Sequence, residues 1–123
     1  MEFDIYGKYQ DVALVITDDL LIYDRDSALK LIKDVKQGVN CHKFIISKAC
    51  VAEDFFSTSS AYTIEVLQNF VNLRIRIAIV GDYSVYHDNG FIKIINSANT
   101  GDRIYFTDTI EDAVKKLEID EKY

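Results

Sequence analysis

The sequence predicts an α/β fold in which helices pack on a mostly parallel sheet. Three observations lead to this prediction. The apolar run at residues 77–80 ends at Gly81-Asp82, which is typical of a strand covered on both faces. Segments with helical apolar periodicity alternate with such short runs along the chain. Near the start, two short runs lie close enough in sequence to form a hairpin.

The expected hairpin is made of residues 2–6 and residues 11–16. The first run alternates around two apolar residues, and the second, DVALVI, is mostly apolar. Residues 20–22 are a further short apolar run, which we expect to continue the second strand. This hairpin would supply the antiparallel part of the sheet.

A helix is expected from Ala28, preceded by several candidate N-cap residues at 24–27. Gly38 suits the position just past the end of such a helix. Residues 41–46 are then expected to form a strand, and residues 47–60 an irregular loop with one helical turn. The apolar stripe of the helix is Ala28, Leu29, Leu31, Ile32 and Val35.

The second half of the chain repeats this alternation. A helix is expected to begin at residue 58 or 60 and to end at Asn72, before the strand that ends at Gly81. Residues 83–89 form a second predicted loop. The predicted buried face of this helix consists of Ile64, Leu67, Phe70 and Val71.

A third helix is expected where apolar residues recur at helical spacing from residue 91 to residue 98. A last strand follows at residues 103–106. Asp108 and Glu111 have the spacing of a capping box, which predicts a final helix as far as Leu117.

Composition indicates one globular domain spanning residues 1–123. The net charge of −6 argues against a nucleic-acid surface and against an anionic membrane surface. The chain shows no signal peptide and no apolar run of membrane-spanning length, so we expect a cytoplasmic protein. The two cysteines, Cys41 and Cys50, are therefore expected to be reduced thiols.

Four segments give the chain a resemblance to a known family. They are DFF at residues 54–56, LQNF at 67–70, AIVGDYS at 78–84 and ANTGDRIYF at 98–106. On these segments the chain resembles an uncharacterised bacterial family, the domain of unknown function 4180, over nearly its full length. The resemblance implies no activity.

The order of the predicted elements is also similar to that of STAS domains of anti-sigma-factor antagonists. This likeness implies a small module that docks a partner protein and is phosphorylated on a serine at the start of its second helix. The matching residues here are Ser57, Ser59 and Ser60. The Asp-Ser-Ser/Thr-Gly signature of that family is absent, because an irregular loop stands in its place.

Polar residues gather where the predicted parallel strands end. Residues 17–19, 47–54, 81–84 and 107–108 should meet at the carboxyl edge of the sheet, where open α/β sheets bind ligands. Within them, Asp54, Asp82 and Ser84 are candidate ligand-binding or partner-binding residues. For any one of them, a turn or capping role is the commoner use of the residue type.

Aromatic side chains in the two predicted loops suggest a contact surface instead. Phe55, Tyr83 and Tyr86 are candidates for contact with a partner, because interfaces are rich in such residues. Tyr62 and Phe56 are further aromatics of the same region. The alternative is that a loop phenylalanine anchors the loop in the core.

Other chemistries are weakly supported. The cysteine and histidine spacings match no zinc pattern. Cys50 and His87 lie in two loops and are candidates for a catalytic pair, but no oxyanion-hole signature accompanies them. The chain lacks a glycine-rich phosphate loop, so no cofactor and no metal are expected. Asp54 lies too far past its strand for the phosphate acceptor of a receiver domain.

The sequence therefore predicts a regulatory or protein-binding module with a protein partner or with self-association as a homodimer. The alternative is a small-ligand-binding protein or enzyme that uses the acidic strand ends, at Asp82 above all.

Overall fold

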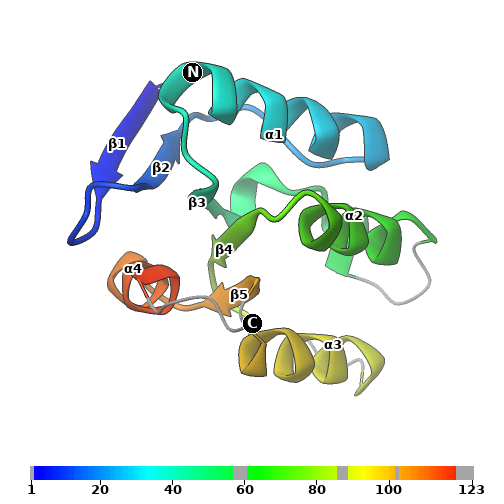
Figure 1. Cartoon of the computed structure of the whole chain (residues 1–123). Coiled ribbons are helices and arrows are strands. Elements are labelled where there is room, and N and C mark those ends of the chain that lie inside the picture. Colours follow the sequence, from blue (N-terminus) through cyan, green and yellow to red (C-terminus); the bar gives the residue numbers. More distant parts are fainter. Residues whose placement is uncertain (1, 57–60, 86–88, 102, 119–123) are drawn as a thin grey trace.

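The computed structural model describes residues 2–56, 61–85, 89–101 and 103–118. Its core is one five-stranded sheet with the strand order β1-β2-β3-β4-β5 (Figure 1). Strands that follow one another in the sequence are therefore neighbours in the sheet. No helix within these described ranges is both long and apolar enough to cross a membrane.

The sheet combines one antiparallel pair with three parallel pairs. β1 (Glu2–Tyr6) runs antiparallel to β2 (Val12–Ile16), so the predicted hairpin is confirmed. β3 (Lys43–Ser47), β4 (Arg76–Val80) and β5 (Ile104–Thr107) continue the sheet in parallel. The predicted α/β class and mostly parallel sheet are thus confirmed.

Residues 20–22 do not continue β2, as the sequence had suggested. Ile22 instead forms an isolated parallel bridge with Val51, and Cys50 O accepts bonds from the backbone N–H groups of Leu21 and Ile22. The reason is geometric, because residues 17–19 turn the chain away from β2 before this segment begins. The segment therefore ties the β2 end to the loop after β3.

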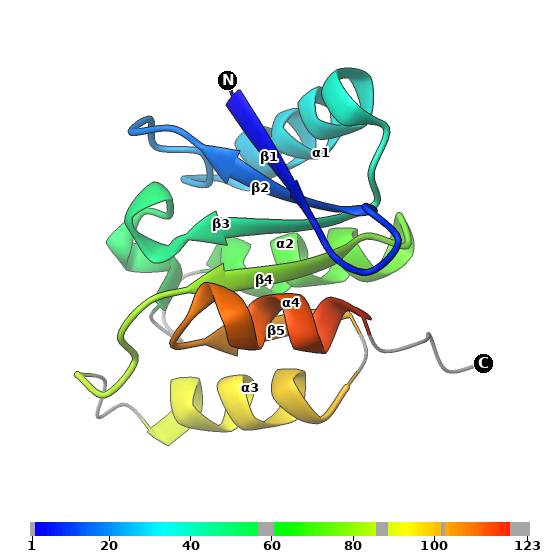
Figure 2. The ribbon, with the colours of Figure 1, turned by 90° about the vertical axis from the view of Figure 1, so that its left-hand side faces the viewer.

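Of the helices in the described residues, three cover one face of the sheet and one lies on the other face (Figure 2). α1 (Arg25–Val39), α2 (Ala61–Asn72) and α3 (Asn89–Thr100) share the larger apolar cluster. α4 (Ile110–Glu118) packs on the opposite face. The predicted loop after β3 contains two short 3₁₀ helices, η1 (Lys48–Cys50) and η2 (Glu53–Phe56).

β4 is covered on both faces, as its apolar run predicts. Ile77 and Ile79 lie in the cluster under α1 and α2, and Ala78 lies in the cluster under α4. Arg76 is fully buried on the α4 side. Its guanidinium donates to the carbonyls of Leu117 at 3.0 Å and Lys116 at 3.2 Å. A buried cation therefore satisfies carbonyls at the last turn of α4, which have no partner within the helix.

The ends of α1 differ from the prediction at Gly38. Asp24 is the N-cap, with its carboxylate accepting from Ser27 N at 2.7 Å. Gly38 lies inside the helix, and a Cβ added there would come 2.7 Å from the ring of Phe3. Asn40, with φ of 55°, takes the left-handed position that ends the helix. Glycine is thus needed at position 38 so that β1 can pack on the helix, and it does not end the helix.

The predicted buried face of α2 is correct for Phe70 and for Leu67, which is half-buried against the core, and wrong for Ile64 and Val71. Thr63, Val66 and Phe70 are buried, whereas Ile64 is 59% exposed and Val71 is 43% exposed. Thr63 Oγ1 donates to Phe55 O at 2.8 Å, a buried contact that helps to fix the rotation of the helix. Periodicity alone could not separate these two faces, because apolar residues occupy both.

Two smaller details also differ from the sequence prediction. Leu29, placed in the apolar stripe of α1, is 36% exposed. The N-cap of α4 is Thr109 and not Asp108, because Thr109 Oγ1 accepts from Asp112 N at 3.1 Å. Both are shifts by one residue within correctly predicted helices.

Candidate functional site

The carboxyl ends of β3 and β4 form an open hollow of about 670 Å³, here called the strand-end hollow. Cys50 Sγ reaches Thr17 O at 3.6 Å, and Gly81 N donates to Thr107 O at 3.0 Å. The segments predicted to meet at this edge are therefore in contact. The hollow is lined by Leu20, Ser47, Lys48, Ala49, Val51, Ala52, Glu53, Val80, Gly81 and Asp82.

Gly81 is required by the wall of this hollow. A Cβ added at Gly81 would collide with the Cβ of Lys48. The Lys48 side chain continues past it and places its ammonium 5.2 Å from the centre of the Phe56 ring. The close approach of β4 to the loop after β3 thus needs a residue without a side chain.

Asp82 and Ser84 form a local turn. Asp82 Oδ1 accepts from Ser84 Oγ at 2.6 Å and from Ser84 N at 2.9 Å. These bonds, first that from the hydroxyl, and the nearby Lys48 charge lower the pKa of Asp82 below its usual range. The carboxylate is therefore ionised and exposed, and one of its oxygens has a turn-forming role.

Of the two alternatives for the loop aromatics, the core-anchor role fits Phe55, and Tyr83 is half-buried. Phe55 is fully buried, and its ring packs edge-on against Phe56 at 5.4 Å. Tyr83 packs against Phe106 at 5.4 Å and donates its hydroxyl to Ile79 O at 2.8 Å. These rings hold the two loops against the sheet.

Asp54 is exposed and fixed by a neighbouring tyrosine. Tyr62 Oη donates to Asp54 Oδ1 at 2.6 Å, which links the loop after β3 to the first turn of α2. Burial, followed by this contact with the carboxylate, raises the pKa of Tyr62 well above its usual range. The remaining candidates lie outside the described residues, namely Ser57, Ser59, Ser60, Tyr86 and His87.

Both cysteines are buried free thiols. Burial raises the pKa of Cys41 and of Cys50, so each stays protonated at neutral pH. A protonated, enclosed thiol is a weak nucleophile. Within the part of the chain that is described, no three histidine, cysteine or acidic side chains come together as a metal-binding group.

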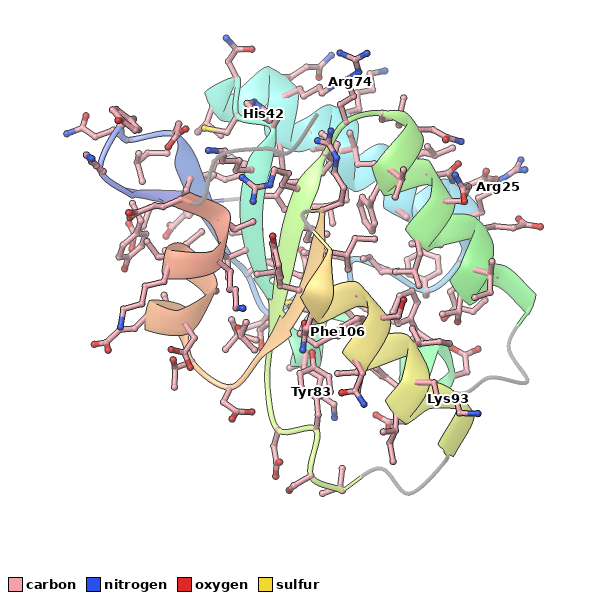
Figure 3. All side chains as sticks on the ribbon, turned by 60° about the horizontal axis from the view of Figure 1, so that its bottom comes forward. Arg25, His42, Arg74, Tyr83, Lys93 and Phe106 are labelled. Carbon is pink, nitrogen blue, oxygen red and sulfur yellow. The ribbon has the colours of Figure 1, made fainter. Side chains whose placement is uncertain are left out.

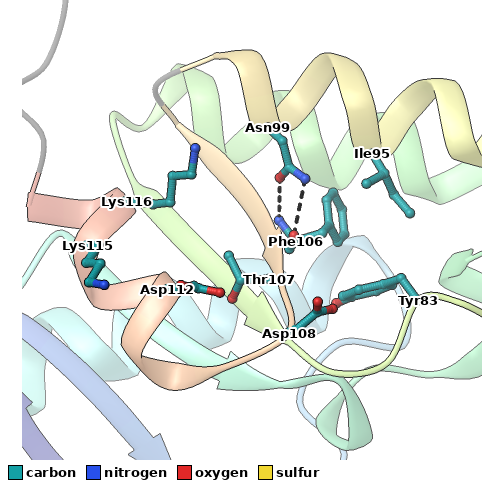
Figure 4. A pocket seen from close by; sticks show the side chains of 9 residues that line it. All are labelled: Tyr83, Ile95, Asn99, Phe106, Thr107, Asp108, Asp112, Lys115 and Lys116. Atoms are coloured by element: carbon teal, nitrogen blue, oxygen red, sulfur yellow. Dashed lines mark hydrogen bonds between the residues drawn. The ribbon is translucent and has the colours of Figure 1, made fainter.

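A second hollow, of about 550 Å³, lies beside β5 between α3 and α4 (Figure 4). Asn99 lines this hollow, and its side-chain amide hydrogen-bonds to the outer edge of β5. Its Oδ1 accepts from Phe106 N at 2.7 Å, and its Nδ2 donates to Phe106 O at 3.2 Å. The amide therefore occupies the place of a neighbouring strand and protects the sheet edge. The sequence places Asn99 only at a helix end and gives no sign of this pairing.

An apolar hollow lies between α2 and α3. We call it the α2–α3 groove, a hollow of about 360 Å³ lined by Ile64, Leu67, Lys93, Ile94, Ser97 and Ala98. Leu67, Ile94 and Ala98 are half-buried in it. Figure 3 shows α2 and α3 as separate ridges on the same side of the molecule. Sequence reasoning missed this groove because it assigned Ile64 to the core.

Ile64 also borders a smaller hollow, of about 280 Å³, on the other side of α2. Arg25 and Gln68 line this hollow, and so does Asn69. The Asn69 Nδ2 atom is buried and has no hydrogen-bond partner among the described residues. A protruding isoleucine is thus bordered by two hollows and by an unsatisfied donor.

A family model matches residues 8–117, most of the chain. The chain belongs to this family, the domain of unknown function DUF4180. The family therefore covers the strand-end hollow, the α2–α3 groove and the Asn99 edge contact alike. No curated protein matches the chain.

A solved structure from Thermotoga maritima, described as a proposed anti-sigma factor antagonist, is also similar. The TM-score is 0.49 and the sequence identity is 16%, with 96% of this chain and 94% of that chain covered. The likeness thus extends over both chains at a low level of identity.

Proposed function

We propose that this domain is a cytoplasmic regulatory, protein-binding module and that its partner contacts the α2–α3 groove. The observation that carries the proposal is the exposure of Ile64, 59% of whose surface is open between two hollows. Clustered exposed apolar side chains on a small domain are typical of protein-contact surfaces. The family assignment leaves the partner open.

The surroundings of Ile64 support this proposal. Ile92 is 36% exposed on α3, and Leu67 and Ile94 form the floor of the groove. Apolar anchors with a few polar groups around them are the usual composition of a binding hot spot.

Site-specific photo-crosslinking tests the proposal directly. A benzophenone amino acid is placed at position 64 in the chain expressed in its native host, and the crosslinked protein is identified by mass. The matched control has the same group at Lys33, which is exposed on α1. We expect one protein to be crosslinked from position 64 and not from position 33.

Binding is then measured with the purified partner and two serine variants. Ile64→Ser should weaken binding at least tenfold, because truncating an apolar anchor removes a hot-spot contact. Leu29→Ser, a comparable change on α1, should leave the affinity unchanged. Equal crosslinking from both positions, or equal affinities of the two variants, would contradict the proposal.

A second candidate function rests on the strand-end hollow, which has room for a small ligand. In this alternative, the ionised Asp82 would bind a cationic or hydroxylated group. Native mass spectrometry of the gently purified protein tests it. A small molecule that is retained by the wild type and lost in Asp82→Asn would favour this function, and a protein without bound small molecules would count against it.

A further inference from the structure

The two faces of the sheet are covered unequally. Three helices lie on one face, whereas α4 is the helix described on the other. α4 packs mainly over β3, β4 and β5. In Figure 2 the ribbons of β2 and β3 are seen between β1 and α4. Among the described residues, no helix other than α4 lies on this face.

The uncovered part of this face lies at β1 and at the carboxyl end of β2. Val12 of β2 and Ile45 of β3 are fully buried on this face, whereas Tyr6 of β1 is 38% exposed. Neighbouring strands lie about 4.8 Å apart, so five strands span about 19 Å, and a helix with its side chains is about 10 Å across. α4 therefore covers about half of this face.

Apolar side chains line this uncovered part, which we call the α4 trough and define by Tyr6, Leu14, Ile16, Ile110 and Val114. Leu14 and Val114 are half-buried and pack against the cluster under α4. Ile16 is 40% exposed and Ile110 is 39% exposed. The trough thus has an apolar surface, with Leu14 and Val114 half-buried and Ile16 and Ile110 more exposed.

The borders of the trough are acidic. Glu2 pairs with Ile16 and Asp4 with Leu14 across the β1–β2 ladder, so both carboxylates lie on the trough side of β1. On α4, Glu118 follows Ile110 and Val114 at four-residue spacing, which places it in the same row. Carboxylates therefore border the trough on both β1 and α4.

Two cations on this face are already engaged, and Lys115 and Lys116 of α4 line the hollow beside β5 instead. Lys43 Nζ bonds Asp11 Oδ2 at 3.2 Å, and Arg76 is buried under α4 against backbone carbonyls. They do not neutralise the carboxylates of β1 and α4. The trough combines an apolar floor with negative walls.

We propose that the α4 trough is a second docking surface, which takes an amphipathic helix of a partner protein with lysine or arginine on both sides of its apolar stripe. The apolar floor matches the stripe, and the carboxylates on both walls match the flanking cations. A second copy of this chain fits less well. A two-fold axis through the trough would place the same carboxylates against one another.

Methyl NMR with two designed peptides tests this proposal. Both are helical peptides of about 15 residues with the same leucine stripe, one flanked by lysines and the other by glutamates. The lysine peptide should shift the methyl signals of Leu14, Ile16 and Val114 and leave that of Ile64 in place. The glutamate peptide should shift none of them.

Charge variants supply the matched control. The double variant with Glu2→Lys and Asp4→Lys should weaken binding of the lysine peptide about fivefold, and added salt should do the same in the wild type. Glu65→Lys on α2 changes the charge by the same amount per substituted residue and should not change the affinity for the lysine peptide. Both acidic sites are exposed, so the variants should fold.

Four results would overturn the proposal. They are no binding of the lysine peptide, equal binding of both peptides, peptide-induced shifts at Ile64 and Leu67 instead, and concentration-dependent shifts of the trough methyls in the chain alone. The last result would identify the occupant as a second copy. None of them bears on the crosslinking test of the α2–α3 groove, so the two proposals can fail separately.

Discussion

The two faces of the sheet are built in different ways. Under α1, α2 and α3, the side chains that meet are apolar, and Phe44 packs edge-on against Phe70 at 6.4 Å. Under α4, the cluster is smaller and contains Arg76, which is fully buried, and Tyr105. One face is held by apolar burial over a large area, and the other depends on a charged side chain that fixes one helix.

This difference teaches where the fold is most sensitive to single polar contacts. On the larger face, many apolar contacts share the stabilisation. On the α4 face, Arg76 donates to Leu117 O, Lys116 O and the Tyr105 hydroxyl. Loss of that one side chain would leave several buried acceptors without a donor.

The largest expected effect is therefore that of Arg76→Met. It should lower the free energy of unfolding by about 3 kcal/mol, because it removes charge-assisted bonds to α4. Urea denaturation measures the loss, and hydrogen exchange should show faster exchange in α4 than in α1. A variant with unchanged α4 exchange would show that α4 does not depend on Arg76.

Asn99→Ala comes next, because it exposes the edge of β5. Loss of both bonds to Phe106 should cost about 2 kcal/mol of unfolding free energy. Gln68→Ala is the control, since it removes an exposed side-chain bond to Asn72 and should cost under about 0.5 kcal/mol. Equal costs would mean that Asn99 does not protect the edge.

Substitutions at two neighbouring residues of α2 should affect stability in the order opposite to their hydrophobicity. The polar Thr63 should matter more for the free energy of unfolding than the apolar Ile64. Thr63→Val should cost about 1 kcal/mol, because the buried Phe55 carbonyl loses its donor. Ile64→Ser should change stability by less than about 0.5 kcal/mol, since Ile64 is mostly exposed. Urea denaturation of both variants checks the rotation of α2, and the reverse order would place Ile64 in the core.

The smallest effect concerns pH and the buried thiols. Burial raises the folded-state pKa of Cys41 and Cys50, so the folded protein keeps these protons at a pH where the unfolded chain releases them. Stability should therefore fall as pH rises above about 8.5, the usual thiol pKa. Replacing both cysteines by alanine should flatten this fall. If stability falls with pH just as steeply in the variant without cysteines, other groups cause the fall.

Local sequence was sufficient for the kind and order of the elements. The run at β4, the helical spacing from Ile110 to Leu117 and the two runs of the β1–β2 hairpin each carry their own periodicity. These patterns depend on which side chains can be buried together within one element. The meeting of polar loops at the carboxyl edge followed from the parallel order alone.

The candidate surfaces were harder to predict, because they depend on the rotation of whole elements. Ile64 and Thr63 are adjacent, and their roles are exchanged by a turn of about 100°. By sequence alone, Phe55 and Tyr83 could equally have formed a surface. In the fold, Phe55 packs against Phe56 and Tyr83 packs against Phe106 of β5.

The sequence by itself determined the α/β class, the hairpin and the alternation, since each follows from apolar spacing within a short segment. Only the tertiary structure decided that the Phe3 ring packs on Gly38 and that Asn99 hydrogen-bonds to the edge of β5. It also placed Glu2 and Asp4 on the α4 side of the sheet. These features join residues far apart in the chain. Their physical cause is the packing of one element on another, which no local pattern contains.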